Sequence, residues 1–149
     1  MEFNRHISRR LHEEHQATLA LWGRLEASLA AGKPDAALMR SAAASLAEEI
    51  DRHFAFEEAE LFPRLAAASE GDIAGLLAEE HAVIRTAAKS FIALARADPA
   101  DPKLKPLGLE LAERLVSHVQ KEEMSMLPAL EDLLDESADA ELTSQYVMT

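Results

Sequence analysis

The stretch HFAFEE at residues 53–58 recurs as HVQKEE at residues 118–123, 65 positions further along the chain. A second phrase, LHEEH at residues 11–15, recurs as LAEEH at residues 77–81, at an offset of 66 positions. Both repeats keep histidine and glutamate in register while most other positions differ, which indicates two similar structural units. The repeat therefore predicts a pseudo-symmetric site made of these two residue types, and we interpret it as a site for a pair of metal ions.

Hydrophobic residues around these phrases recur every three or four positions, which is the period of an amphipathic α-helix. Four such segments are expected, at about residues 4–31, 34–68, 72–97 and 102–134, with short breaks between them. Long helices with short connections pack as antiparallel neighbours, so the predicted fold is all-α, an up-down-up-down four-helix bundle. In this prediction the bundle covers residues 1–135, and residues 136–149 are a loosely attached C-terminal tail.

Pro63 and Pro128 interrupt two of these helical patterns, each ten residues after a repeated histidine. A proline inside a helix removes one backbone hydrogen bond and clashes with the preceding turn. Two outcomes are compatible with this position: the helix bends at the proline, or it stops there and a new helix starts.

The composition excludes several classes of function. The chain has 149 residues, the size of one ordinary domain, and it contains no cysteine, which rules out disulfides, zinc fingers and iron–sulfur clusters. A formal net charge of −12 argues against nucleic acids and anionic membranes as partners. The chain also lacks an apolar start that could serve as a signal peptide and any apolar run near the roughly 20 residues of a membrane span. We therefore expect a cytoplasmic protein with a small-molecule ligand; its oligomeric state is not indicated.

Residues four apart on a helix share one face, so His53 with Glu57, and His118 with Glu122, can each point an imidazole and a carboxylate at one small volume. One such pair is a weak signal by itself. The stronger signal is that these pairs are in register with two further repeated histidines, and that all four imidazoles fall on apolar helix faces. Buried imidazoles and carboxylates need compensation, and two cations supply it.

Two other interpretations remain open: the histidines are ordinary buried side chains, or the histidines and glutamates neutralise one another by hydrogen bonding. Nitrogen and oxygen ligands without thiolate suit iron, manganese or zinc. The two glutamates would bridge two ions, and open coordination positions would accept a small ligand. The predicted metal ligands are His15, His53, Glu57, His81, His118 and Glu122. No catalytic residue outside this set is indicated.

The ordered ligand set, with LFP at residues 61–63 and MLP at residues 126–128, resembles the haemerythrin-like or HHE cation-binding domain over about residues 8–134. The resemblance implies a four-helix bundle around two iron ions, a non-haem di-iron centre that can be oxo-bridged. It further implies a protein that binds or senses dioxygen, nitric oxide or peroxide. The alternatives are a di-iron enzyme of the peroxidase or oxidase type, and a zinc- or manganese-binding structural module. We favour binding or sensing, because no acid, base or nucleophile stands out beyond the metal site.

The chain departs from the oxygen-carrying members of that family at Arg85, where they have a second third-helix histidine; a guanidinium cannot bind a metal. This departure argues against reversible oxygen carriage. The candidates for a replacement ligand are water, Glu49, Glu58 and Glu123, and the last two are disfavoured because they lie about 100° around the helix from the predicted ligands.

Among the remaining polar residues, we predict that Glu14 and Glu80 are exposed charges, with hydrogen bonds to outer imidazole nitrogens as the alternative. His6 and His12 are predicted to lie on the surface.

Overall fold

The computed structural model describes residues 2–148, and this part of the chain is helical without a strand, which confirms the all-α class. Three short elements have π-type winding, labelled η. In chain order the elements are α1 (His6–Ala30), α2 (Ala36–Glu48), η1 (Glu49–Phe54), η2 (Glu57–Leu61), α3 (Phe62–Ala67), α4 (Gly71–Ala97), α5 (Leu104–Lys121), η3 (Glu122–Met126), α6 (Leu127–Leu133) and α7 (Glu136–Met148).

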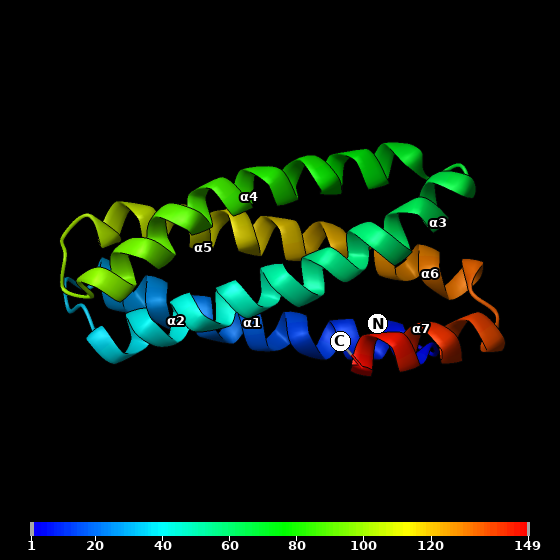
Figure 1. Cartoon of the computed structure of the whole chain (residues 1–149), viewed down its shortest axis with the longest axis horizontal. Coiled ribbons are helices and arrows are strands. Elements are labelled where there is room, and N and C mark those ends of the chain that lie inside the picture. Colours follow the sequence, from blue (N-terminus) through cyan, green and yellow to red (C-terminus); the bar gives the residue numbers. More distant parts are fainter. Residues whose placement is uncertain (1, 149) are drawn as a thin grey trace.

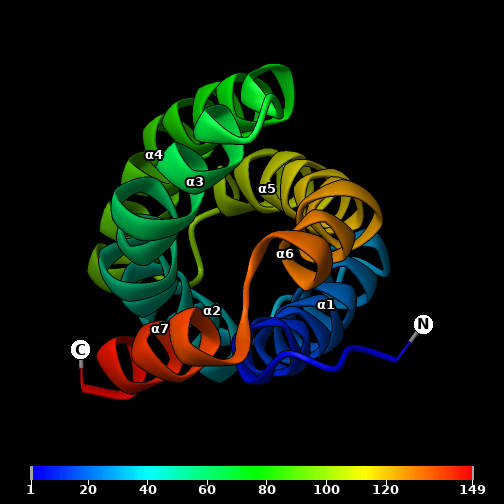
Figure 2. The same ribbon diagram turned by 90° about the vertical axis from the view of Figure 1, so that its right-hand side faces the viewer.

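The breaks between the long helical segments fall where the sequence predicts them, near residues 31–35, 68–70 and 98–103. Figure 1 shows the chain turning back at each of these breaks, so that successive segments lie lengthwise beside one another. Helix α5 packs against α1 and α4, and α2 packs against α1 and α4. Seen from the end in Figure 2, these segments surround a common interior.

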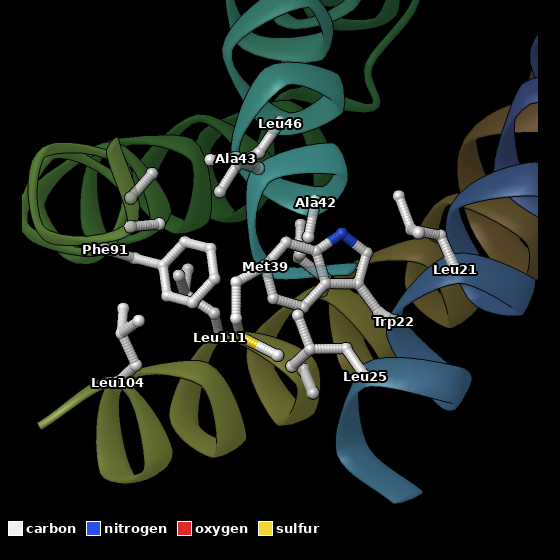
Figure 3. Packing of buried hydrophobic residues seen from close by; sticks show 14 of the residues in the cluster. Leu21, Trp22, Leu25, Met39, Ala42, Ala43, Leu46, Phe91, Leu104 and Leu111 are labelled. Atoms are coloured by element: carbon white, nitrogen blue, oxygen red, sulfur yellow. The ribbon is translucent and has the colours of Figure 1, made fainter. Parts of the chain in front are cut away.

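One apolar cluster fills the interior near the loops at residues 31–35 and 98–103. Figure 3 shows the side chains of Trp22 (α1), Met39 (α2) and Phe91 (α4) converging there, and the rings of Trp22 and Phe91 lie 5.4 Å apart. Gly108 allows α5 to approach α1 closely, because a Cβ atom at this position would lie 2.6 Å from Cδ1 of Leu29. We call this group the tryptophan cluster; its members include Leu21, Trp22, Leu25, Leu29, Met39, Leu46, Phe91, Leu104 and Leu111.

A second apolar cluster lies toward the other end of the molecule and includes Ile7, Leu11, Phe56, Leu61, Leu65, Leu77, Leu130, Leu142 and Tyr146. In each long segment the predicted histidine lies between residues of the two clusters. His15, for example, lies between Leu11 and Trp22 along α1. The polar site is therefore a layer between two apolar clusters.

The two interior prolines do not break the helical path. Pro63 and Pro128 occupy the first turns of α3 and α6, directly after the π-type turns η2 and η3. The residues that flank these junctions keep right-handed helical backbone angles. A proline cannot donate to the carbonyl four residues earlier and its ring needs room in that turn, and a wider turn meets both requirements. The predicted interruption thus takes the form of a π-type turn, a feature that is frequent at functional sites.

The C-terminal residues correct one prediction, because they form a docked helix rather than a loosely attached tail. Leu142 and Tyr146 of α7 are fully buried. The Asp139 carboxylate accepts hydrogen bonds from the backbone amides of His6 and Ile7, both at 2.9 Å. Helix α1 has no side-chain cap of its own, so α7 caps it from the far end of the chain. In Figure 1, α7 lies beside the N-terminal part of α1, and the two helices are in contact.

Among residues 2–148, no helix combines the length and the apolar character that crossing a bilayer requires.

Candidate metal centre

The structure brings together all six of the residues predicted as ligands, and each is at most 2% exposed. They come from six elements: His15 from α1, His53 from η1, Glu57 from η2, His81 from α4, His118 from α5 and Glu122 from η3. They form two groups, each with two imidazoles and both carboxylates, whose possible ligand atoms lie within 4.8 Å of one another. The first group holds His15 and His53, which we call the first histidine pair. The second holds His81 and His118, the second pair.

Glu57 contributes one oxygen to each group. Its Oε2 atom lies 3.1 Å from Nε2 of His53 in the first pair. Its Oε1 atom lies 3.2 Å from Nε2 of His81 in the second pair. A carboxylate with its two oxygens directed at two separate imidazoles has the geometry of a bridging ligand.

Glu122 repeats this arrangement from the opposite side of the layer. Its Oε1 atom lies 2.8 Å from Nε2 of His15, and its Oε2 atom lies 3.1 Å from Nε2 of His118. The repeat seen in the sequence is therefore a repeat in space, in which each glutamate connects the two histidine pairs.

The centre of this layer is not satisfied by hydrogen bonds alone. Oε1 of Glu57 and Oε2 of Glu122 are buried, and neither makes a hydrogen bond with another described residue, although imidazole nitrogens lie close by. In the second pair, Nε2 of His81 and Nε2 of His118 lie 3.1 Å apart, a contact that can hold one proton at most. Unpaired buried carboxylate oxygens are costly. Cations among these atoms would satisfy all of them, so the donor set fits metal ions.

Each imidazole also has an outer partner. The Nδ1 atom of each of the four histidines faces a glutamate that lies outside the two groups. The four contacts are His15 with Glu123 at 2.8 Å, His53 with Glu14 at 3.2 Å, His81 with Glu58 at 2.7 Å, and His118 with Glu80 at 2.9 Å. An acceptor at Nδ1 keeps the proton on that nitrogen, fixes the ring orientation and leaves Nε2 free to bind a metal.

These outer partners revise the sequence predictions. Glu14 and Glu80 were predicted to be exposed charges, and this was wrong. Both are partly buried and contact the histidines His53 and His118, as the alternative interpretation had it. Glu58 and Glu123 were disfavoured as metal ligands, and neither belongs to the two groups. The available signal was the repeat itself, because all four glutamates recur together with their histidines.

Arg85 stands where a further histidine ligand was missing, and its side chain forms two hydrogen bonds with Glu58, at 2.6 and 2.9 Å. Arg85 thus fixes the position of the Glu58 carboxylate, which in turn contacts Nδ1 of His81. Glu49, another candidate replacement, accepts a hydrogen bond from Thr18 at 3.2 Å and lies outside both groups. His6 is exposed, as predicted. His12 is about one-third exposed and contacts Glu123, so it lies at the edge of the outer ring.

The electrostatics of the layer keep protons on the imidazoles. Burial lowers the pKa of His15, but hydrogen bonds with Glu122 and Glu123 outweigh burial and raise it to about 9. Burial likewise opposes a charged His118, and the nearby negative charge of Glu122 raises its pKa to about 9. The pKa of Glu122 is raised by burial and lowered more strongly by His118, so it lies well below its usual range. The positive charge of the protonated imidazoles thus lies beside the two carboxylates, where a metal cation would also be stabilised.

The two sides of the layer differ in their surroundings. The Phe54 ring stacks parallel on His81 at 3.8 Å, and the Phe62 ring lies 5.2 Å from it, so aromatic groups shield the second pair. On the side of the first pair, a cavity of about 440 Å³ between α1 and α2 is lined by His53, Thr18 and Glu49 among other residues. His53 of the first pair therefore borders a cavity on this side of the layer.

The family model described as the hemerythrin HHE cation binding domain matches residues 6–143, almost the whole chain. No curated protein and no solved structure matches the chain significantly.

Proposed function

The chain belongs to the hemerythrin HHE cation binding domain family, and from this premise we propose that it is a non-haem di-iron protein that binds or senses a small ligand. Dioxygen, nitric oxide and peroxide are the ligands that we propose. The proposed architecture is an antiparallel up-down-up-down four-helix bundle, to which α7 is added as a docked helix.

The observation that carries this proposal is the sharing of the two central carboxylates. Glu57 and Glu122 each direct one oxygen at each histidine pair. Each of the two groups has the same donors, two imidazoles and one oxygen from each carboxylate, which supports one ion in each group. The proposed ligands are therefore the six predicted residues, with the two glutamates as bridges.

Iron is the proposed metal, because imidazole and carboxylate donors suit iron, and manganese and zinc are the alternatives. Bound iron would supply open coordination positions and a redox couple. The protein's own residues hold the imidazoles at fixed tautomers through the outer glutamates and shield the second pair with Phe54 and Phe62. We place ligand entry on the first pair, because His53 lines the cavity between α1 and α2.

Reconstitution with ferrous iron under anaerobic conditions tests this function. We expect two irons per chain by elemental analysis, and an absorption change when air, nitric oxide or peroxide is added. His53→Ala and His118→Ala should lower the iron content. His6→Ala, outside the site, should leave it unchanged.

Protein that stays free of iron in this experiment would contradict the proposal. Two zinc ions per chain after growth in a defined medium, with no colour and no response to these ligands, would favour the structural alternative instead.

A further inference from the structure

The repeat governs the inner part of the site but not its outermost contacts. His15 with Glu123 is matched by His81 with Glu58, and His53 with Glu14 is matched by His118 with Glu80. The next contact outward breaks this symmetry. Glu80 is bound by Lys121 from α5, whereas Glu14 is bound by Tyr146 from α7, a helix that lies after both repeated halves.

Tyr146 is closely tied to the first histidine pair. Its hydroxyl donates to Oε1 of Glu14, the same oxygen that lies 3.2 Å from Nδ1 of His53. Its ring lies edge-on to the His53 ring at 6.3 Å and contacts the Phe56 ring at 4.6 Å. The Arg52 guanidinium lies 4.3 Å from the centre of the tyrosine ring. Because Tyr146 is fully buried and contacted from several sides, its hydroxyl has a defined direction.

The Glu14 carboxylate has several competing partners, so the tyrosine hydroxyl matters for its orientation. Its side chain is about one-quarter exposed and is also contacted by Arg10 at 3.1 Å and Arg52 at 3.4 Å. Both arginines contact the other oxygen, Oε2. Without the tyrosine hydroxyl, these cations and solvent would compete with His53 for the carboxylate, since exposed ion pairs of this kind hold no single geometry firmly.

We propose that Tyr146 is a positioning residue for the metal ion at His15 and His53, acting through Glu14 on the orientation of His53. This inference rests on the proposed function. It makes the two metal positions inequivalent: the docking of α7 controls the first, and Lys121 supports the second. Helix α7 is then part of the metal centre as well as a cap for α1.

Stepwise binding of ferrous iron to the full chain under anaerobic conditions tests the inference, with Tyr146→Phe as the main variant. This change removes one oxygen atom and keeps the buried ring. We expect one of the two binding steps to weaken about tenfold, the lower end of what the loss of an outer hydrogen-bond partner causes, with the other step unchanged. Lys121→Met is the matched control and should weaken the other step instead.

A second readout identifies the affected histidine. In zinc-loaded protein, the Nδ1–H signal of His53 in the proton NMR spectrum should shift or broaden in Tyr146→Phe, while the signal of His118 stays in place. A tyrosine that only packs in the core would leave both signals and both binding steps unchanged.

The route through Glu14 is tested by a double-mutant cycle. In a Glu14→Gln background, Tyr146→Phe should cause little further loss of affinity, because the two changes affect one connection. If the affinity losses of the two substitutions add fully, Tyr146 does not act through Glu14.

Wild-type protein that binds two irons, with Tyr146→Phe binding both as tightly or weakening both steps equally, would overturn the inference alone. Wild-type protein that binds no iron would overturn the proposed function and this inference with it.

Discussion

The tryptophan cluster and the histidine–glutamate layer are both closed to solvent, yet they are stabilised by different forces. In the cluster, Trp22, Leu25 and Phe91 bury apolar surface, a contribution that does not depend on protonation. In the layer, imidazoles and carboxylates compensate one another's charge, so the stability of the layer depends on protons and on cations. The difference shows how one set of helices keeps a costly polar layer in place: apolar clusters on both sides hold the helices together.

The largest expected effect comes from the layer. Glu122→Gln should lower the free energy of unfolding of the metal-free protein by about 4 kcal/mol, because it leaves charged His15 and His118 without their buried partner. Urea unfolding near neutral pH measures this change. Glu13→Gln on the exposed face of α1 is the control and should change stability by less than about 0.5 kcal/mol. A loss as small as that of the control would show that charge does not stabilise the layer.

The tryptophan cluster gives the contrasting case. Leu25 is fully buried, and Leu25→Ala should cost about 3 kcal/mol through lost burial and the cavity left behind. Urea unfolding in acidic, neutral and alkaline buffer, with and without metal, should give the same loss each time. A loss that varies with pH would mean that the cluster and the layer are coupled, and the comparison would fail.

The pH dependence of the metal-free protein separates the two regions further. His15 and His118 have folded-state pKa values raised from 6.5 to about 9. Their contribution is therefore fully present below about pH 6.5 and is lost as the pH rises through about 9. We expect a loss on the order of a few kcal/mol across this window, less than the two pKa shifts would give separately, because both histidines share Glu122 and titrate as coupled sites.

Urea unfolding of the metal-free protein at several pH values across that window measures this loss. Metal affinity should change in the opposite direction and increase with pH, because the metal displaces the imidazole protons. Stability that increases between neutral and alkaline pH would contradict the role of these two histidines.

The smallest expected effect lies at the end of the molecule. Asp139→Ala should cost about 1 kcal/mol, the usual value of a helix cap, since it frees the amides of His6 and Ile7. Amide hydrogen exchange at these two residues should become faster, while exchange in the tryptophan cluster stays unchanged. Glu141→Gln, at an exposed position of α7, is the control.

The sequence was sufficient to predict the long helical segments and the six residues that the structure brings together, because hydrophobic periodicity and a repeat are both local patterns. Pro63 and Pro128 indicated where the helical pattern is interrupted. The π-type turns themselves depend on which backbone carbonyls lose their hydrogen-bond donors, and hydrophobic periodicity carries no information on this. The positions of Glu14 and Glu80 depend on neighbouring helices. Each glutamate directly precedes a predicted histidine on its own helix, and this spacing places it on a different face. Each nevertheless reaches a histidine of a neighbouring segment, His53 or His118.

Helix α7 was missed for a related reason. Only Leu142 and Tyr146 mark its buried face clearly, which is too short a pattern to distinguish a docked helix from a tail. Asp139 contacts residues more than 130 positions away, a pairing that no local pattern reveals.

That pairing has a consequence for the order in which the molecule is completed. A ribosome releases α1 long before Asp139 has been added, so the amides of His6 and Ile7 lack this carboxylate until residue 139 has been synthesised. The first turn of α1 is thus held by a residue more than 130 positions further along the chain. A product truncated before Asp139 would therefore fray at the first turn of α1, and this turn would become more open to proteases.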